Sequence, residues 1–360
     1  MPLLSLQLKN FRQFEHSGFD FHPRRNLIIG GNAAGKSTVL ESVHYLSLGR
    51  SIRAKTSEKL IREGSEWLSV TGVVQHRGKN YTISAQQQGI DRSLIINGAL
   101  GSKIIESARL LPVSLLSPDS HYEFQRDTKQ RRAAIDWVLF HVEQGYQGIW
   151  ARYQRVLLQR NAVLKSGGNM RTISVWDEEL ALHGDSIQEF RQEVINKLNP
   201  LFRHYCDALL SGEIIAELEF KAGWDSQFGL KACLSKDSEI DRRSGHTHSG
   251  PHRSDLAFLF GNGGDASQSS HGQKKLLFVA LKLAQATLLH QACGMDCTLL
   301  VDDLSAELDT DRLRAVVDSL SEFPGQIILT SIHVDPWASI WQDYRAFHVK
   351  HGRLMETQNN

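Results

Sequence analysis

The chain has 360 residues, of which 41% are hydrophobic, so it is long enough for two domains or for one large domain with an insertion. Its 41 basic and 40 acidic residues nearly balance, so overall charge gives no argument for nucleic-acid binding and any such surface must be a local patch. The first residues contain no continuous apolar core of signal-peptide length, and no stretch is expected to approach the apolar length that spans a bilayer.

Four cysteines stand in the second half of the chain, at Cys206, Cys233, Cys293 and Cys297. The closest pair, C-G-M-D-C, has neither the usual zinc spacing nor a second pair nearby, so it does not predict a metal site. We expect free thiols, which suit a reducing cytoplasm.

The first third of the chain is predicted to contain short strands and one helix. Alternating apolar and polar residues predict a half-buried strand at 4–9, and further short strands are expected at 19–21 and 26–29. A helix should follow and run to about Leu48. The later strands are expected at 67–74, 81–86, 94–97 and 110–116, with a tight turn at Asn97-Gly98.

The stretch 27–38 is the most informative part of the chain. An apolar run leads into a glycine-rich loop and a helix, and the string GGNAAGKS fits G-x-x-x-x-G-K-[ST], the phosphate-binding loop. Gly30 and Gly35 permit backbone angles that other residues resist, so successive N–H groups and the positive end of the helix can form an anion cradle. Lys36 can reach the β- and γ-phosphates, and the Ser37 hydroxyl can ligate Mg²⁺. The alternative is a glycine-rich turn that matches by chance.

The predicted phosphate-binding set is the loop with the first residues of its helix. Its members are Gly30, Gly31, Asn32, Ala33, Ala34, Gly35, Lys36, Ser37 and Thr38.

Helical spacing of apolar residues dominates from about Arg126 to about Leu210, with a break at 167–169. A helical block placed between strands is typical of an inserted lobe, and the absence of a long heptad register argues against a coiled coil. After the block we expect a strand at 214–220, a polar segment at 235–249 and a strand at 256–260.

An S-x-G-Q run, formed by Ser270, Gly272 and Gln273 around His271, opens a long apolar helix. A hydroxyl and an N–H at a helix N-terminus can bind a second phosphate group. One nucleotide needs only one cradle, so two cradles in a chain suggest two chains that share two nucleotides. The alternative is a serine N-cap without a nucleotide role.

The run LLLVDD predicts a buried strand that ends in two acids. Asp302 falls at the strand edge that faces a ligand in an open α/β sheet, where it can hold Mg²⁺. Asp303 is then placed to polarise a water against a γ-phosphate. The alternative is an acid pair that caps the next helix.

The order of these motifs, with the residues 305–309 after them, resembles that of ATP-binding-cassette ATPases. The wide separation of the first and third motifs is similar to the chromosome-maintenance branch rather than to transporter subunits. Four further strings, LKNFRQFE, SLGRSIRAKT, TKQRRAAIDW and GPHRSDL, resemble the RecF family of bacterial recombination mediators, and this resemblance spans essentially the whole chain.

The resemblance implies an α/β fold, an ABC-type ATPase head with a P-loop NTPase core sheet, an antiparallel β-subdomain and an inserted helical lobe. The expected core is discontinuous and comprises 1–118 and 250–360. The expected lobe, mainly helical, comprises 119–249 and carries the approach to the S-x-G-Q motif.

The resemblance also implies a DNA-binding protein of recombinational repair and replication-fork maintenance with ATP and Mg²⁺ as cofactors. It implies a weak DNA-stimulated ATPase, binding to duplex DNA and gap junctions, and a homodimer that forms on ATP. RecR and RecO are the expected partners in loading RecA on gaps covered by single-strand-binding protein. The expected location is cytoplasmic, nucleoid-associated on DNA, without a membrane. By position, Lys36 and Asp303 would be catalytic, Ser37 and Asp302 would hold Mg²⁺, and the S-x-G-Q residues would act across the dimer.

Some positions depart from the general cassette pattern. Cassette ATPases usually carry Gln between the lobes, and the nearest candidate here is Asp119. A switch His is expected directly after the strand that ends at Thr330, but His333 lies two residues further on. The γ-phosphate sensor therefore stays open between these two. Asp303 is one methylene shorter than the usual Glu, which is consistent with slow turnover.

Basic residues after the first helix and at the start of the helical lobe are candidates for DNA contact, with solvated surface as the alternative. They are Arg50, Arg53, Lys55, Arg126, Lys129, Arg131 and Arg132. The first three could instead contact nucleotide or a partner. His246, His248 and His252 invite a metal site, but they lack a convincing fourth ligand, so a polar loop is the better interpretation.

Three other functions compete with this reading. A transporter's ATPase subunit would need a coupling Gln loop and a membrane partner. A nuclease of the cassette class would need an additional domain with an acidic nuclease site, and we expect the residues after Gly352 to be too few to form one. A DNA clamp in which hydrolysis is incidental stays open.

Overall fold

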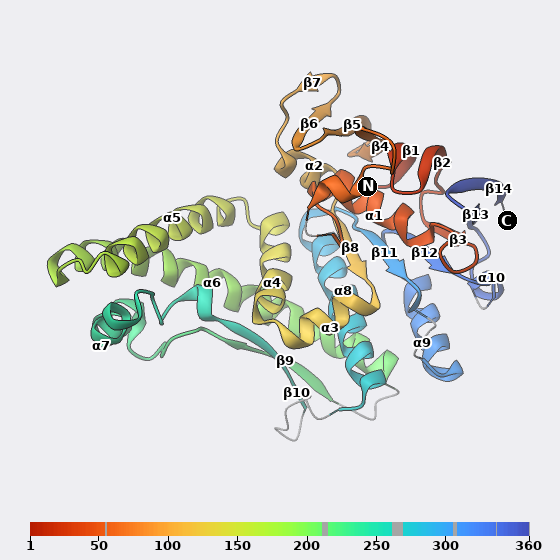
Figure 1. Ribbon diagram of the computed structural model, residues 1–360. Helices are drawn as coiled ribbons and strands as arrows, with labels where there is room; N and C mark the ends of the chain where they lie inside the picture. Colours follow the sequence, from red (N-terminus) through yellow and green to blue (C-terminus); the bar gives the residue numbers. More distant parts are fainter. Residues whose placement is uncertain (55, 211–214, 261–268, 305–307, 336, 360) are drawn as a thin grey trace. The chain divides into compact units, whose positions relative to one another are not determined.

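The computed structural model describes residues 1–54, 56–210, 215–260, 269–304, 308–335 and 337–359. They form two compact units, Met1–His121 with Leu289–Asn360, and Tyr122–Leu288 (Figure 1). The second junction differs from the expected one, because the described residues between 250 and 288 group with the lobe rather than with the core. The reason is pairing: β10 (Asp255–Phe260) is antiparallel to β9 (Ala216–Lys221), and Gln285 donates a 2.6 Å hydrogen bond to the Ala134 carbonyl.

The first unit contains an antiparallel six-stranded sheet in the order β2-β1-β4-β5-β6-β7. Its strands are β1 (Leu3–Phe11), β2 (Phe14–Asp20), β4 (Trp67–His76), β5 (Lys79–Gln88), β6 (Asp91–Ile96) and β7 (Ala99–Leu100). The predicted tight turn joins β6 to β7, where Asn97 and Gly98 have φ of 49° and 83°.

A second six-stranded sheet of this unit has the order β14-β13-β3-β12-β11-β8. Its strands are β3 (Arg25–Ile29), β8 (Val113–Leu116), β11 (Thr298–Asp302), β12 (Gln326–Ser331), β13 (Arg345–Lys350) and β14 (Arg353–Asn359). All neighbours are parallel except β13 and β14. The register sets Asp302 beside Thr330 and Thr330 beside Ile28, so the carboxyl ends of three strands meet at one edge.

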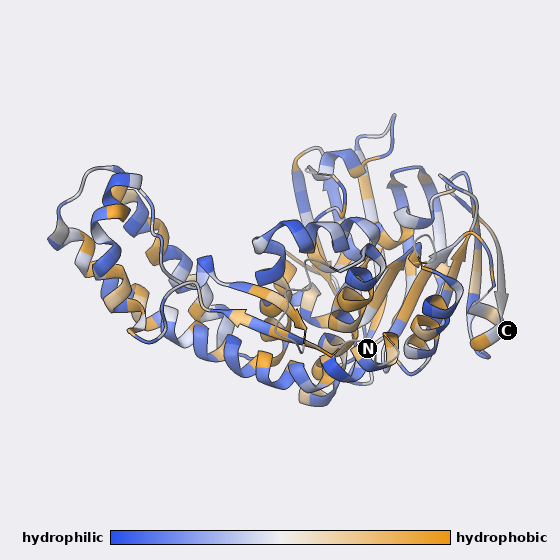
Figure 2. Cartoon of the chain, turned by 90° about the horizontal axis from the view of Figure 1, so that it is seen from below, coloured by the Kyte–Doolittle hydropathy of each residue, from blue (hydrophilic) through white to orange (hydrophobic). Residues whose placement is uncertain are grey.

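Helix α1 (Lys36–Leu48) packs against β4 and β5 of the antiparallel sheet and against β11 and β12 of the parallel sheet. Its side chains Val39, Leu40 and Val43 belong to the core cluster, which draws on both sheets. Hydrophobic residues accordingly dominate the parallel strands (orange in Figure 2). A helix buried on several sides holds the loop before it in a fixed position.

Several elements of the first unit differ from the sequence prediction. The expected strand at 110–116 is instead α2 (Ile104–Leu110) followed by β8, and β2 starts at Phe14 rather than Phe19. The hairpin partner β14 was not predicted. The remaining helices are η1 (Ser57–Leu60), α9 (Thr310–Ser321) and α10 (Trp337–Ile340).

The second unit is mainly helical. Its elements are α4 (Thr128–Val142), α5 (Tyr146–Lys165), α6 (Met170–Leu209), α7 (Gly229–Ser244) and η2 (Pro251–Arg253), with the β9–β10 pair. Helices α3 (Pro118–Arg126) and α8 (His271–Cys293) each cross a junction between the units. The helical pattern and its break before Asn169, which caps α6, are confirmed. Helix α7, which continues to Ser244 and covers most of the polar segment expected at 235–249, was not predicted.

Helix α8 corrects the expectation that no stretch reaches membrane-spanning length. By length and composition His271–Cys293 could cross a bilayer, and 67% of its most apolar window is buried in the protein. A core helix gives the same pattern.

Candidate nucleotide-binding site

The phosphate loop has the predicted strand–loop–helix setting. It leaves β3 at Ile29 and enters α1 at Lys36. Gly35 has a φ of 116°, which residues other than glycine rarely adopt, and Ala33 has a φ of 60°. A Cβ at Gly30 would lie 2.4 Å from the Val349 carbonyl oxygen, so only glycine fits there. The conformation of the loop is therefore set by its close contact with the parallel sheet.

Lys36 lies across this loop. Its Nζ donates hydrogen bonds of 2.8 Å to the Gly30 carbonyl and 3.0 Å to the Gly31 carbonyl, and the residue is 9% exposed. Burial lowers the pKa of Lys36, while the charges of Asp303 and Asp302 oppose that shift. The ammonium thus sits inside the cradle, where an anion would otherwise meet only backbone dipoles.

The acid-ended strand meets this cradle at Asp302. Ser37 and Thr330 each donate a 2.8 Å hydrogen bond to Asp302 Oδ1. The structure therefore brings the two predicted Mg²⁺ ligands, Ser37 and Asp302, into contact across 265 residues. Thr330 was missed as a site residue, because only the register of β11 and β12 sets it beside Asp302.

Asp303 follows directly and has a φ of 45°, an uncommon conformation for a residue other than glycine. Its backbone N–H donates a 3.1 Å hydrogen bond to Thr330 Oγ1, which helps to hold this conformation. Strained backbone of this kind clusters at functional sites.

Three basic residues were predicted in the loop after α1. Arg53 does not simply face solvent: its Nη2 donates a 2.9 Å hydrogen bond to Asp302 Oδ2. Arg50 is exposed, and its carbonyl contacts His44 Nδ1 at 3.0 Å. Lys55 lies outside the described residues. The structure therefore joins Arg53 to the nucleotide site.

The other loop positions surround the same cradle. Thr38 Oγ1 donates a 3.1 Å hydrogen bond to Gln13 Oε1, and the Gly352 N–H donates one of 3.0 Å to the Ala34 carbonyl. Gly31 and Asn32 are exposed, as a loop that receives a ligand requires.

The S-x-G-Q motif forms a capping box at the start of α8. The Gln273 N–H donates to Ser270 Oγ at 3.3 Å, and the Ser270 N–H donates to Gln273 Oε1 at 3.1 Å. Gly272 is half-buried in the first turn. The serine N-cap is thus real, and within this chain both side chains serve it.

Both candidate γ-phosphate sensors are exposed. Asp119 is exposed in the first turn of α3, whose start is fixed by Ser117 Oγ accepting from the Ser120 N–H at 3.1 Å. His333 is exposed, and its backbone N–H donates to Ser331 Oγ at 3.3 Å. The strand before it ends at Ser331, one residue later than predicted.

Two of the basic residues expected to contact DNA are used inside the lobe. Arg131 forms a two-pronged pair with Asp255 at 2.7 and 2.9 Å, and Arg132 donates to the Ser254 carbonyl at 2.9 Å. Arg126 and Lys129 are exposed. The string GPHRSDL therefore serves partly as an anchor for α4.

Buried arginines fasten the rest of the lobe. Arg191, fully buried, pairs with Asp136 at 2.9 and 3.0 Å, donates to the Pro251 carbonyl at 2.7 Å, and lies 5.0 Å from the Trp150 ring centre. Tyr146 also donates to Asp136, at 2.6 Å. These contacts join α4, α5, α6 and η2.

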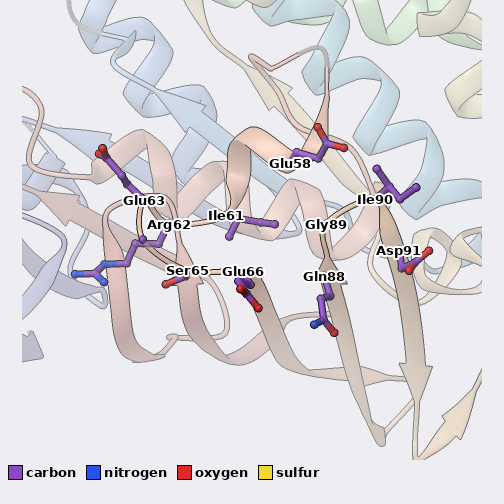
Figure 3. Close-up of a pocket in the computed structure, with 11 residues that line it drawn as sticks. Glu58, Ile61, Arg62, Glu63, Ser65, Glu66, Gln88, Gly89, Ile90 and Asp91 are labelled. Atoms are coloured by element: carbon purple, nitrogen blue, oxygen red, sulfur yellow. The ribbon is translucent and has the colours of Figure 1, made fainter.

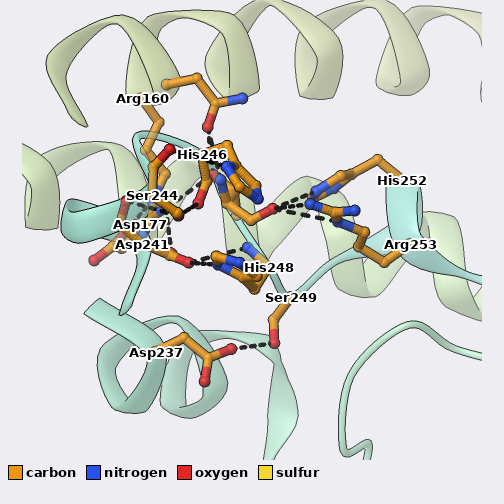
Figure 4. A network of polar contacts seen from close by, with 12 residues as sticks. Arg160, Asp177, Asp237, Asp241, Ser244, His246, His248, Ser249, His252 and Arg253 are labelled. Carbon is orange, nitrogen blue, oxygen red and sulfur yellow. Dashed lines mark hydrogen bonds and ion pairs between the residues drawn. The ribbon is translucent and has the colours of Figure 1, made fainter. Parts of the chain in front are cut away.

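A second network surrounds the histidines of the 246–252 segment (Figure 4). Arg160 donates 2.7 Å hydrogen bonds to Asp177 and Asp241, and His248 Nδ1 lies 2.7 Å from Asp241. His252 contacts the Tyr153 hydroxyl at 2.7 Å. Among the described residues no group of three or more His, Cys, Asp and Glu side chains could hold a metal.

This packing predicts an acid-sensitive fold. Burial lowers the pKa of His252 and of His44 to about 4. Between pH 6.5 and 4 the unfolded chain binds these protons and the folded chain does not, so stability falls as the pH falls through that window. Each histidine should contribute a slope of about 1.4 kcal/mol per pH unit. Urea unfolding of His252→Gln from pH 7 to 4 should show a shallower slope than wild type, and an equal slope would contradict the assignment.

A surface hollow of about 660 Å³ lies between the segment after η1 and the β5–β6 turn (Figure 3). Its only lining guanidinium, Arg62, is 3.3 Å from Glu15. Its lining carboxylates are those of Glu58, Glu63, Glu66 and Asp91. Such a lining repels a triphosphate, so this hollow is not the nucleotide site.

Comparisons with known proteins show the same fold and identify the family. A profile of the family described as RecF/RecN/SMC N terminal domain matches residues 2–354. The DNA replication and repair protein RecF of Vibrio atlanticus (strain LGP32) is 33% identical over 358 residues, which cover 98% of this chain and 99% of that protein. Its namesake from Pseudomonas fluorescens (strain SBW25) is 33% identical over 366 residues, which cover 100% of both chains.

Solved structures show the same similarity. The recombination mediator protein RecF with ATP, from the RecFOR pathway, matches 100% of this chain and 97% of its own with a TM-score of 0.85 and 25% identity. An SMC head bound to the C-terminal winged-helix domain of ScpA matches with a TM-score of 0.65 and 14% identity, which shows the fold alone. The fold is thus that of an ABC-type ATPase head, and the chain belongs to the RecF family of DNA replication and repair proteins.

Proposed function

We propose that this chain binds ATP in the cradle around Lys36 and closes on DNA as a homodimer that slow hydrolysis releases. The single observation that supports this most is the contact of Ser37 with Asp302, beside a loop that presents backbone N–H groups and a buried ammonium. Ser37 and Asp302 both offer oxygen ligands of the type that Mg²⁺ prefers, so the residues present fit that ion. When bound, Mg²⁺ would supply charge neutralisation at the β- and γ-phosphates.

The roles of the chain's own residues follow from their positions. The loop 30–35 and the N-terminus of α1 bind the phosphates, and Lys36 neutralises their charge. Asp303, held by Thr330, orients and deprotonates the attacking water; its short side chain is consistent with slow turnover. Ser270, Gly272 and Gln273 of a second copy complete the site from the first turn of α8.

The biological setting is proposed from family membership. The chain acts in recombinational repair and replication-fork maintenance, in the cytoplasm and on the nucleoid. It binds duplex DNA and gap junctions, and with RecR and RecO it helps to load RecA on gaps covered by single-strand-binding protein. The structure of RecF with ATP in the RecFOR pathway supports this setting.

Ser270→Arg tests the shared site. In the free chain Ser270 is exposed, so the larger side chain should leave the fold intact while blocking a nucleotide-bound partner. We expect ATP and Mg²⁺ to convert wild type to dimer in sedimentation velocity, more so with gapped duplex DNA, and Ser270→Arg to stay monomeric. Ser270→Thr, which keeps the N-cap hydroxyl, is the matched control. Normal dimerisation of Ser270→Arg would overturn the shared site.

Among the described residues, the remaining DNA-contact candidates are the exposed Arg50, Arg126 and Lys129. Reversing all three to Glu should weaken binding to duplex DNA by about tenfold or more at low salt and reduce the slope of log affinity against log salt. The nucleotide affinity should not change. A matched triple reversal elsewhere on the exposed surface controls for net charge, at Lys79, Arg243 and Arg314. Equal salt slopes for both triple variants would contradict the assignment.

A further inference from the structure

Glu41 is a buried carboxylate on α1 for which the proposed chemistry has no direct use. It is 4% exposed, and its carboxylate contacts two other segments. Arg12, at the turn after β1, donates to both of its oxygens at 3.0 and 3.1 Å. Ser51 donates a short hydrogen bond to Oε1 of the same carboxylate. Burial alone would raise the pKa of Glu41, but the hydrogen bonds from Arg12 and Ser51 outweigh it, so the pKa is lowered and the group stays ionised.

Ser51 also binds the backbone of the residues that follow it. Its Oγ accepts hydrogen bonds from the N–H of Arg53 at 3.0 Å and from the N–H of Ala54 at 2.7 Å. At the other end of the loop, the Arg50 carbonyl is 3.0 Å from His44 Nδ1 on α1. The segment 50–54 is therefore tied to the helix of the phosphate loop at both ends, although its outer surface is partly exposed.

The side chain that this segment carries reaches Asp302. The Arg53 guanidinium is 53% exposed and could move in solvent, yet it lies 2.9 Å from Asp302 Oδ2. Ser37 and Thr330 already donate to Oδ1, so both oxygens of Asp302 have donors. A metal cation at this carboxylate would meet a fixed positive charge on the same group, and the two like charges oppose one another.

We infer that Glu41 is a positioning residue that, through Ser51, holds Arg53 where it competes with a metal cation for Asp302. This inference rests on the proposed Mg²⁺–ATP site and adds a residue that sets the Mg²⁺ concentration needed to fill it. The Arg53 guanidinium raises the Mg²⁺ concentration that the site needs, because Mg²⁺ can bind Asp302 only when the guanidinium gives up part of its contact with that carboxylate. A purely structural role for Glu41 predicts a loss of stability with no change in that concentration.

The first test is a Mg²⁺ titration of binding of the fluorescent analogue mant-ATP to the full chain. Removing the exposed guanidinium in Arg53→Gln should lower the half-saturating Mg²⁺ concentration by about two- to fivefold, the range of a solvent-screened ion pair. Ser51→Ala and Glu41→Gln should shift it in the same direction, and Ser51→Thr, which keeps the hydroxyl, should restore the wild-type value. The double variant Glu41→Gln with Arg53→Gln should shift no further than Arg53→Gln alone.

The second test needs no nucleotide. Hydrogen exchange of the Ala54 amide should be about fivefold faster in Ser51→Ala, because this amide loses a hydrogen bond worth about 1 kcal/mol. Wild-type exchange there in Ser51→Ala would overturn the positioning role. So would variants at Glu41 and Ser51 that unfold earlier in urea but keep the wild-type Mg²⁺ dependence. If wild type binds no mant-ATP at any Mg²⁺ concentration, the proposed function itself fails, and the exchange measurement still decides whether Ser51 holds the loop.

Discussion

Lys36→Arg should lower kcat for ATP hydrolysis by about 10²- to 10³-fold, the usual cost of one misplaced electrostatic donor. The buried ammonium fits between the Gly30 and Gly31 carbonyls at 2.8 and 3.0 Å, and a planar guanidinium cannot occupy that space in the same way. The positive charge is kept, so nucleotide binding should persist. Phosphate release under steady-state conditions measures the first effect and mant-ATP binding the second.

This variant also separates two accounts of hydrolysis. If hydrolysis releases the dimer, Lys36→Arg should assemble on gapped duplex DNA with ATP and leave it far more slowly than wild type does. Dissociation at the wild-type rate despite slow turnover would favour a clamp in which hydrolysis is incidental. Lys9→Arg, an exposed change on β1, is the matched control and should behave as wild type.

Asp136→Ala should destabilise the helical lobe by about 3–5 kcal/mol, because it leaves a fully buried guanidinium without its carboxylate. The converse change should cost less. In Arg191→Met the stranded Asp136 is 22% exposed and can regain water, so we expect about 1–3 kcal/mol. The cause of the asymmetry is the difference in burial of the two partners.

Trp150 reports on this pair directly, because its ring stacks on Arg191. Urea unfolding followed by tryptophan fluorescence should therefore give a free energy of unfolding that is highest for wild type, lower for Arg191→Met and lowest for Asp136→Ala. Glu193→Ala on the same helix removes an exposed pair with Lys197 and should cost less than about 1 kcal/mol. Equal costs for Asp136→Ala and Glu193→Ala would mean that the buried pair adds no stability.

Periodicity and turn chemistry were enough to predict most strands and the long helices. The parallel strands read as continuous apolar runs because both faces are covered, and Asn97-Gly98 supplied a turn with its own mechanism. Helix α7 was missed because its pattern is mostly polar, and α2 because it is one short stretch of a longer apolar run. The junction near 250 depends on which strand β10 pairs with, and pairing across distant segments is not written in local composition.

At the site, the residues with a local signature were found and those defined by tertiary contact were not. Lys36, Ser37 and Asp302 belong to short motifs whose chemistry follows from their spacing. Thr330 joins them only through the register of two parallel strands. Arg131 looked like a DNA contact because its partner, Asp255, lies 124 residues away. Two roles were predicted for Ser270, phosphate binding across a dimer and N-capping of α8, and a single chain can show only the second.

The place of β3 in its sheet has a consequence for how this protein is made. The strand that leads into the phosphate loop pairs with β12 and β13, which begin at Gln326 and Arg345. At a synthesis rate of about 5–20 residues per second, β3 leaves the ribosome roughly 15–60 s before these partners exist. The nucleotide cradle therefore cannot form on the nascent chain. A truncated product would expose an unpaired apolar strand instead, which makes it a substrate for chaperones and proteases rather than a half-active ATPase.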